Sequence, residues 1–161
     1  MEIRKSTPND IDTILQIFTA ARAYMATHGN ATQWDDNYPG KDILTHDIAQ
    51  NVNYVLLDHG DIVGTFTFII GDEPTYRIIE NGTWHYHTPY GTIHRLASNG
   101  KASGIAKACF DFCTSHIGHI RIDTHRNNLA MRSAIEKYGF RPCGIVYVRN
   151  GAARIAYDYR I

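Results

Sequence analysis

The chain has 161 residues, of which 43% are hydrophobic, and its 16 Lys and Arg residues balance 16 Asp and Glu residues. That length predicts one domain, residues 1–161, large enough to bury a core without disulfides or metals. A net charge of zero argues against a nucleic-acid groove, which needs a basic stripe. No signal peptide or membrane-length apolar run is evident, and three cysteines favour reduced thiols. We therefore expect a cytoplasmic protein that binds neither nucleic acid nor membrane.

The first half of the chain predicts a strand, two helices and two further strands. A short strand at residues 3–4 precedes helix-capping residues at 7–10, and apolar residues then recur at helical spacing from Ile11 to Met25. A loop spans residues 28–40. Residues 42–50 favour a second, short helix, whereas residues 54–57 and 62–70 predict two strands joined by a turn.

The second half alternates strands and helices before a closing hairpin. Residues 71–90, polar and aromatic together, favour a loop with a short extra strand. Strands at 90–97 and 117–124 alternate with helices at 103–116 and 127–138, the last ended by Gly139. Residues 140–148 and 153–159 form a hairpin through an Asn-Gly turn. The order β-α-α-β-β-β-α-β-α-β-β predicts a single mixed α/β layer fold.

The segment Lys101-Ala102-Ser103-Gly104-Ile105-Ala106 lies between a predicted strand and a predicted helix. Small residues at a helix start leave main-chain N–H groups and the positive end of the helix dipole open to an anion. The same residues also suit any tight helix entry. A P-loop is excluded, because Arg95 stands where its first glycine is needed, and the dinucleotide fingerprint is absent as well.

Two motifs carry a resemblance to a known family. The pattern K-x-x-G-x-A at residues 101–106 resembles the Arg/Gln-x-x-Gly-x-Gly/Ala pyrophosphate loop of the GNAT superfamily of N-acetyltransferases. Residues 128–140 resemble its Asn-to-Gly-Phe segment, with Met131 and Lys137 in register. The resemblance implies the α/β GNAT fold, a single mixed and mostly antiparallel sheet flanked by helices, with strands that splay at the acetyl-CoA site. It also implies acetyl transfer to an amine.

The resemblance assigns acetyl-CoA, the expected co-substrate, to particular residues. Its pantetheine would pair like an extra strand with Leu96 and Ala97, and Asn128 would contact it from the next helix. The acetyl carbonyl would lie between residues 95–97 and 123–125. The main-chain contacts to the pyrophosphate would come from Lys101, Ala102, Ser103, Gly104, Ile105 and Ala106.

Direct attack of a neutral amine on the thioester requires a base, donors for the oxyanion and an acid for the thiolate. Many family members use a Tyr of the Asn-to-Gly-Phe helix as the acid, but Ile135 stands at that position here. Tyr138, one turn further on, and Tyr147, on the following strand, are the alternatives. Because thiol pKa values lie near 8.5, coenzyme A also leaves tolerably without an acid.

His94 is the first candidate for the base, because it precedes the anion loop and histidine titrates near neutral pH. A hydrogen-bonded structural histidine is the alternative interpretation. Strand alternation places His94 on the face of Leu96, opposite Arg95. Asp123 and His125, at the end of the neighbouring strand, are further candidates, although Asp123 is equally suited to pair with an arginine or cap a helix.

The acceptor site is expected in the loop between the first two helices, where the family commonly forms it. Gln33, Trp34 and Tyr38 would line this site together with His94. Trp34 is equally suited to pin the loop to the core. The acidic residues 35–36 either attract a cationic amine or are solvated.

The sequence also offers a pair of candidate metal ligands and a rival function. His85 and His87 share one strand face, but no carboxylate or cysteine nearby in the sequence completes a ligand set, so we expect no metal. Ile135 at the acid position favours a rival function, a non-catalytic acyl-CoA-binding or sensor domain. The expected partners are acetyl-CoA and a small amine of unknown identity, and the chain is either a monomer or a homodimer.

Overall fold

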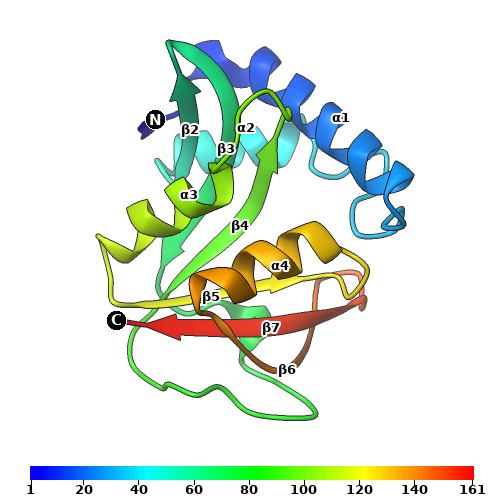
Figure 1. Cartoon of the computed structure of the whole chain (residues 1–161), viewed down its shortest axis with the longest axis vertical. Coiled ribbons are helices and arrows are strands. Elements are labelled where there is room, and N and C mark those ends of the chain that lie inside the picture. Colours follow the sequence, from blue (N-terminus) through cyan, green and yellow to red (C-terminus); the bar gives the residue numbers. More distant parts are fainter.

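The computed structural model describes all 161 residues and contains one seven-stranded sheet with helices on both faces (Figure 1). Short 3-10 turns lie at Pro8–Asp10 and Pro74–Tyr76. No helix combines the length and apolarity that a membrane span requires. The strands are β1 (Glu2–Lys5), β2 (Asn53–Asp58), β3 (Asp61–Ile70), β4 (Gly91–Ser98), β5 (His119–Thr124), β6 (Arg141–Tyr147) and β7 (Ala153–Arg160). The helices are α1 (Ile11–Thr27), α2 (Lys41–Ala49), α3 (Ile105–Thr114) and α4 (Leu129–Tyr138).

The strand order is β1-β2-β3-β4-β5-β7-β6, and every neighbouring pair is antiparallel except β4 and β5. The predicted order of elements and the mixed, mostly antiparallel sheet are therefore confirmed. The predicted extra strand between residues 71 and 90 is wrong. That segment forms only the second 3-10 turn and an isolated bridge between Glu80 and Ile145. Its aromatic side chains pack onto the face of the sheet, and its main chain does not pair as a strand.

Alternating side chains of the sheet divide the core between its two faces. One face packs against α3 and α4, which lie in front of the sheet in Figure 1. On the other face, α1 and α2 cover the N-terminal strands. Residues 77–90, which we call the strap, cover the C-terminal strands on the face opposite α4, with Trp84 and Tyr90 against Val146 and Ala156. On this second face, the layer of α1 and α2 and the layer of the strap meet where β4 and β5 separate.

β4 and β5 separate because they pair over only two residues, Gly91 with Ile120 and Thr92 with Arg121. Further along, a β-bulge bends β4. On β3, Thr65 lies opposite Ala97 and Thr67 lies opposite His94, so two residues of β4 face one of β3. The bulge forces Arg95 into a left-handed conformation with φ of +53°.

The predicted alternation around His94 is wrong for this reason. An extra residue shifts the side-chain period of a strand, and every later side chain changes face. Leu96 therefore packs with Ile93 in the core cluster beneath α3 instead of sharing the face of His94. Arg95 and His94 both line the opening between the strands.

A buried ion pair holds α2 over this bulge. The Nε and Nη2 atoms of Arg95 donate to Asp47 Oδ2 at 3.0 and 2.7 Å, and the Thr67 hydroxyl donates to the same oxygen at 2.8 Å. Both charged side chains are nearly inaccessible, with 9% and 5% of their surface exposed. Since a buried ion pair is stable only when its polar atoms are satisfied, these bonds link α2 firmly to β3 and β4.

The strap meets the sheet through a glycine that no other residue can replace without strain. Gly82 has φ of +155°, and a Cβ there would lie 1.9 Å from the Cys143 carbonyl oxygen. We expect Gly82→Ala to lower the free energy of unfolding by about 2–4 kcal/mol in urea denaturation. Gly118→Ala is the control, since a Cβ there meets nothing within 4 Å, and should change stability little. Equal stability of the two variants would contradict this packing.

Candidate active site

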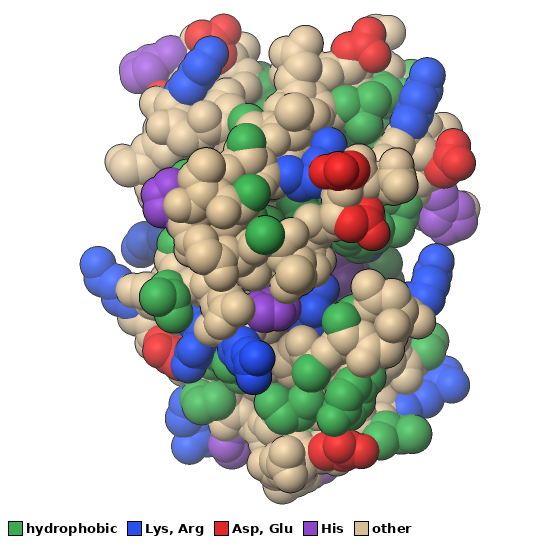
Figure 2. Space-filling model, turned by 90° about the vertical axis from the view of Figure 1, so that its right-hand side faces the viewer, with side chains coloured by type: hydrophobic (Ala, Val, Ile, Leu, Met, Phe, Trp, Pro, Cys, Tyr) green, Lys and Arg blue, Asp and Glu red, His purple; other side chains and the backbone are tan.

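A cavity of about 760 Å³ opens where β4 and β5 diverge. Its walls are the loop between α1 and α2, the segment before the second 3-10 turn, the two splayed strands, the start of α4 and the β6–β7 hairpin. Figure 2 views the molecule from the side where that loop and hairpin meet, and shows Lys, Arg and His side chains in the hollow between the two halves. The cavity is therefore polar and charged.

A second cavity of about 420 Å³ adjoins the first, and is lined mainly by apolar and small residues of α1, α3, α4 and the end of β4. The two cavities share Met25, Leu96, Asn128 and Met131. Alanines at positions 20, 21, 97, 106, 130 and 134 keep the groove open along its length. The arrangement suits a narrow, elongated ligand that ends in the polar cavity.

The far end of this groove is the N-terminus of α3. Gly104 takes a left-handed conformation with φ of +78°, and its α-carbon faces open space. The first bond of the helix runs from the Ala108 N–H to the Gly104 carbonyl, so the preceding N–H groups have no helical acceptor. Earlier in the loop, the Lys101 N–H is not free, because it donates to the Asn99 side chain at 3.0 Å. The N–H groups at the start of α3 and the helix dipole together suit an anion at this point.

The other residues expected to hold the cofactor lie along the groove. Leu96 and Ala97 line it at the end of β4, and Asn128 lines both cavities. The side chain of Asn128 is already engaged, because its Oδ1 accepts from the Met131 N–H at 3.2 Å and its Nδ2 donates to Gln33 Oε1 at 3.0 Å. Asn128 thus caps α4 and joins it to the loop between α1 and α2.

His94 lies in the wall of the polar cavity beside a carboxylate. Its Nε2 is 3.5 Å from Glu73 Oε2, and the Thr75 hydroxyl donates to the other carboxylate oxygen at 2.8 Å. The contact with His94 lowers the pKa of Glu73 to about 2, helped by Thr75 and opposed by burial. Glu73 is a site residue that the sequence did not reveal, because it sits in an irregular segment with no motif.

Asp123 lies in the same cavity at the end of β5. The Tyr76 hydroxyl donates to its Oδ2 at 2.6 Å, and Arg154 Nε lies 3.9 Å from its Oδ1. Burial raises the pKa of Asp123, although Tyr76, His94 and Arg154 oppose that rise. Arg154, on β7, is the second site residue without a sequence motif.

The remaining acid and base candidates lie outside both cavities. The Tyr138 hydroxyl donates to Asp111 Oδ1 at 2.7 Å between α3 and α4, and burial raises the pKa of Tyr138 to about 12. The exposed Tyr147 donates to Glu80 at 2.9 Å. The ring of His125 accepts the Asn127 N–H, and burial lowers its pKa.

The expected acceptor residues Gln33, Trp34 and Tyr38 all line the polar cavity. Gln33 Oε1 accepts from Asn30 at 2.9 Å as well as from Asn128. Trp34 packs edge-on against Phe18 with ring centroids 5.8 Å apart, so it pins the loop to the core and also lines the cavity. The Tyr38 hydroxyl accepts from Arg95 Nη1 at 3.2 Å, which connects the loop to the β4 bulge.

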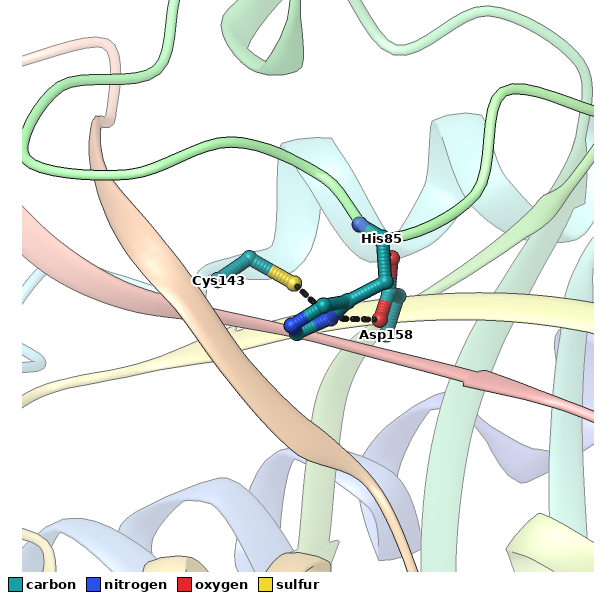
Figure 3. A group of neighbouring side chains, drawn as sticks. All are labelled: His85, Cys143 and Asp158. Carbon is teal, nitrogen blue, oxygen red and sulfur yellow. Dashed lines mark hydrogen bonds and ion pairs between the residues drawn. The ribbon is translucent and has the colours of Figure 1, made fainter.

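A separate polar cluster ties the strap to β6 and β7 (Figure 3). Asp158 accepts from His85 Nδ1 at 2.7 Å and from the main-chain N–H groups of His85 and Tyr86. Cys143 Sγ lies 3.2 Å from the same ring nitrogen. These three side chains carry donor atoms that zinc accepts, but here the His85 ring and the Asp158 carboxylate are joined by a hydrogen bond of 2.7 Å. Burial raises the pKa of the Cys143 thiol to about 12. We assign the cluster an anchoring role.

Solved structures resemble this fold over its whole length. An acetyltransferase of the GNAT family from Streptococcus agalactiae is 30% identical, with a TM-score of 0.90 over 99% of this chain and 95% of that one. The ribosomal-protein-alanine N-acetyltransferase of Brucella melitensis is 17% identical, with a TM-score of 0.62 and full coverage of both chains. The GNAT-like decarboxylase GphF, solved with isobutyryl-CoA, is 14% identical, with a TM-score of 0.70 over 99% of each chain.

No protein-family model matches the sequence, and no curated protein is significantly similar to it. The streptococcal relative nevertheless spans nearly the whole chain at both the sequence and the structural level. The chain belongs to the GNAT family of acetyltransferases. The predicted family and its fold are thereby confirmed.

The contact between Glu73 and His94 predicts a pH-dependent stability. The folded-state pKa of Glu73 lies below its ordinary value, so its stabilising effect is present above that ordinary value and disappears as the pH falls toward about 2. We expect Glu73→Gln to cost roughly 1–2 kcal/mol at about pH 6, with most of that cost gone by about pH 2.5 and the rest gone below about pH 2, measured by urea unfolding. The exposed Glu2→Gln is the control. A cost independent of pH would refute the ionic contribution.

Proposed function

We propose that the protein is an acetyl-CoA-dependent N-acetyltransferase that transfers the acetyl group to a small primary amine by direct attack. The observation that carries the proposal is the His94–Glu73 pair in the wall of the polar cavity, beside Asp123. The adjoining groove, ending at the N-terminus of α3, supports an acyl-CoA as the donor. Membership of the acetyltransferase family supports the acetyl group.

In this proposal the pyrophosphate binds the free amides of residues 103–106, with Lys101 at the rim. The pantetheine follows the groove past Leu96 and Ala97. β4 has no strand partner on the β5 side beyond Thr92, so its main-chain groups there remain open to an extended ligand. The thioester then lies at the junction with the polar cavity.

His94 is the proposed base. His94 Nε2 lies 3.5 Å from the carboxylate of Glu73, which favours a proton on Nε2 and leaves the lone pair of the neutral ring on Nδ1. Nδ1 can then take a proton from the acceptor ammonium directly or through one water. Glu73 acts as a positioning residue that holds this tautomer, as an ionised carboxylate generally does beside a catalytic imidazole. Asp123 adds negative charge that attracts the ammonium and stabilises the imidazolium.

The thiolate leaves without a side-chain acid. Ile135 is fully buried and has no proton to give. The hydroxyls of Tyr138 and Tyr147 donate hydrogen bonds to carboxylates outside the cavities. The thiol of coenzyme A, with an ordinary thiol pKa near 8.5, is a tolerable leaving group. This same absence favours the rival function, an acyl-CoA sensor that binds the thioester without turnover.

Turnover separates the two functions. The protein should release free thiol from acetyl-CoA in the presence of a panel of primary amines, detected with a thiol reagent. Acetyl-CoA binding without thiol release from any amine would favour the sensor.

The anion-binding surface at α3 can be tested with matched glycine variants. Gly104→Val introduces a side chain at the proposed pyrophosphate site, whereas Gly60→Val imposes a similar strain in the β2–β3 turn, with φ of +85° and open space around it. We expect Gly104→Val to weaken acetyl-CoA binding by about 10- to 100-fold in calorimetry, because charge-assisted bonds are lost. Gly60→Val should bind normally. Equal affinities would place the pyrophosphate elsewhere.

The role of His94 predicts a large kinetic effect. His94→Ala should reduce kcat/KM for amine acetylation by about 10²- to 10⁴-fold near pH 7 and flatten its pH dependence between about pH 6 and 9. The exposed His87, on the strap and outside both cavities, provides the control His87→Ala. Full activity of His94→Ala over this range would remove His94 as the base.

A further inference from the structure

Arg154 is a buried cation in the wall of the polar cavity, and the proposed chemistry gives its charge no role. Only 7% of its side chain is exposed. It projects from β7 on the face that carries Asp123 and the strap, and it lines the cavity. Burying a guanidinium is costly unless an anion compensates for it, so its partners decide what the cavity can bind.

The hydrogen bonds of Arg154 use only part of its donors. Its Nη2 donates to the Gln33 carbonyl at 2.9 Å, and its Nη1 donates to the Ala153 carbonyl at 3.3 Å. An arginine has five N–H donors in a planar fork that matches a carboxylate. No carboxylate in this protein makes such a bidentate contact with Arg154. The Nε–H and one N–H of each terminal nitrogen therefore make no hydrogen bond within the protein and remain for an anion in the cavity.

The nearest anion, Asp123, is held loosely by Arg154 and tightly by another group. Its Oδ1 is 3.9 Å from Arg154 Nε, while its Oδ2 takes the Tyr76 hydroxyl at 2.6 Å. The compensation between the two charges is incomplete, and burial lowers the pKa of the Arg154 guanidinium and raises that of the Asp123 carboxyl. A cation and an anion thus stand side by side in one wall.

Such a pair is complementary to a zwitterion lying across it, with its ammonium toward Asp123 and its carboxylate toward Arg154. Because Arg154 Nε and Asp123 Oδ1 are only 3.9 Å apart, the pair best matches a zwitterion whose ammonium and carboxylate sit on the same or neighbouring carbons. An ammonium at Asp123 then lies near Glu73 and His94, the proposed base, because the charges of both residues act on the Asp123 carboxyl. Arg149, exposed on the β6–β7 hairpin, adds positive charge at the same cavity.

We propose that the acceptor is a free α-amino acid, or a close analogue of one, whose carboxylate binds Arg154. This inference deepens the proposed function and rests on it. Arg154 acts in recognition, since its fork orients the acceptor and leaves the amine free to attack. The alternative acceptors, simple amines and peptide N-termini, have no carboxylate next to the amine.

The wild-type protein tests the inference directly. Each protein amino acid is compared with its own α-carboxamide, at saturating acetyl-CoA, by thiol release. We expect the best amino acid to exceed its carboxamide by about 10- to 100-fold in kcat/KM, because a charge-assisted bond to the carboxylate is lost in the amide. Equal rates, or preferential acetylation of a short peptide, would overturn the amino-acid assignment while leaving the acetyltransferase intact. No turnover with any compound would instead contradict the proposed function.

Variants then locate the carboxylate. Arg154→Gln should abolish the preference for amino acid over carboxamide, whereas Arg154→Lys should retain part of it, since the charge remains without the fork. Arg141→Gln, on β6 outside both cavities, is the control for loss of one positive charge. A preference unchanged in Arg154→Gln would remove Arg154 from recognition. If that variant does not fold, calorimetry of the wild type with CoA and each amino acid or carboxamide decides, and equal affinities would refute the inference.

Discussion

The extra residue in β4, and the buried Arg95–Asp47 pair that stabilises it, determine the rest of this structure. A left-handed arginine in a strand costs about 1–3 kcal/mol of strain, which surrounding contacts must offset. Asp47 accepts two bonds from Arg95 and one from Thr67, so the bulge is held from two elements. The bend in β4 follows directly after the two residues at which β4 still pairs with β5. The opening contains both the polar cavity and the junction with the groove.

The apolar groove and the polar cavity share one frame of hydrogen bonds. The side chain of Gln33 accepts a hydrogen bond from the Asn128 side chain, and the main-chain carbonyl of Gln33 accepts one from Arg154. These two bonds join the loop after α1 to the start of α4 and to β7, which are distant in the sequence. Since Asn128 also caps α4, a movement of the loop would disturb the wall of the groove. The walls of the two cavities are therefore mechanically connected.

Much of the fold was predictable, because each element carries its own periodic signal. The helical spacing from Ile11 to Met25, the Asn-Gly hairpin turn and Gly139 as a helix end all depend on neighbours in the sequence. The anion loop was equally local, since the small residues and the helix start are contiguous. The face of Arg95 was not predictable, because the bulge arises from the mismatch between β3 and β4 and from a partner in α2.

The sequence by itself determined the family, the order of elements and the loop suited to the pyrophosphate, because these are encoded in contiguous residues and in short periods. Only the tertiary structure brought Glu73 to His94, and Arg154 to Asp123. Those pairs join residues 21 and 31 positions apart in the chain. Their electrostatics depend on burial and on the angle between splayed strands, and no local pattern encodes either. The surroundings of the proposed base, and the proposed recognition of the acceptor by Arg154, therefore depend on the tertiary structure.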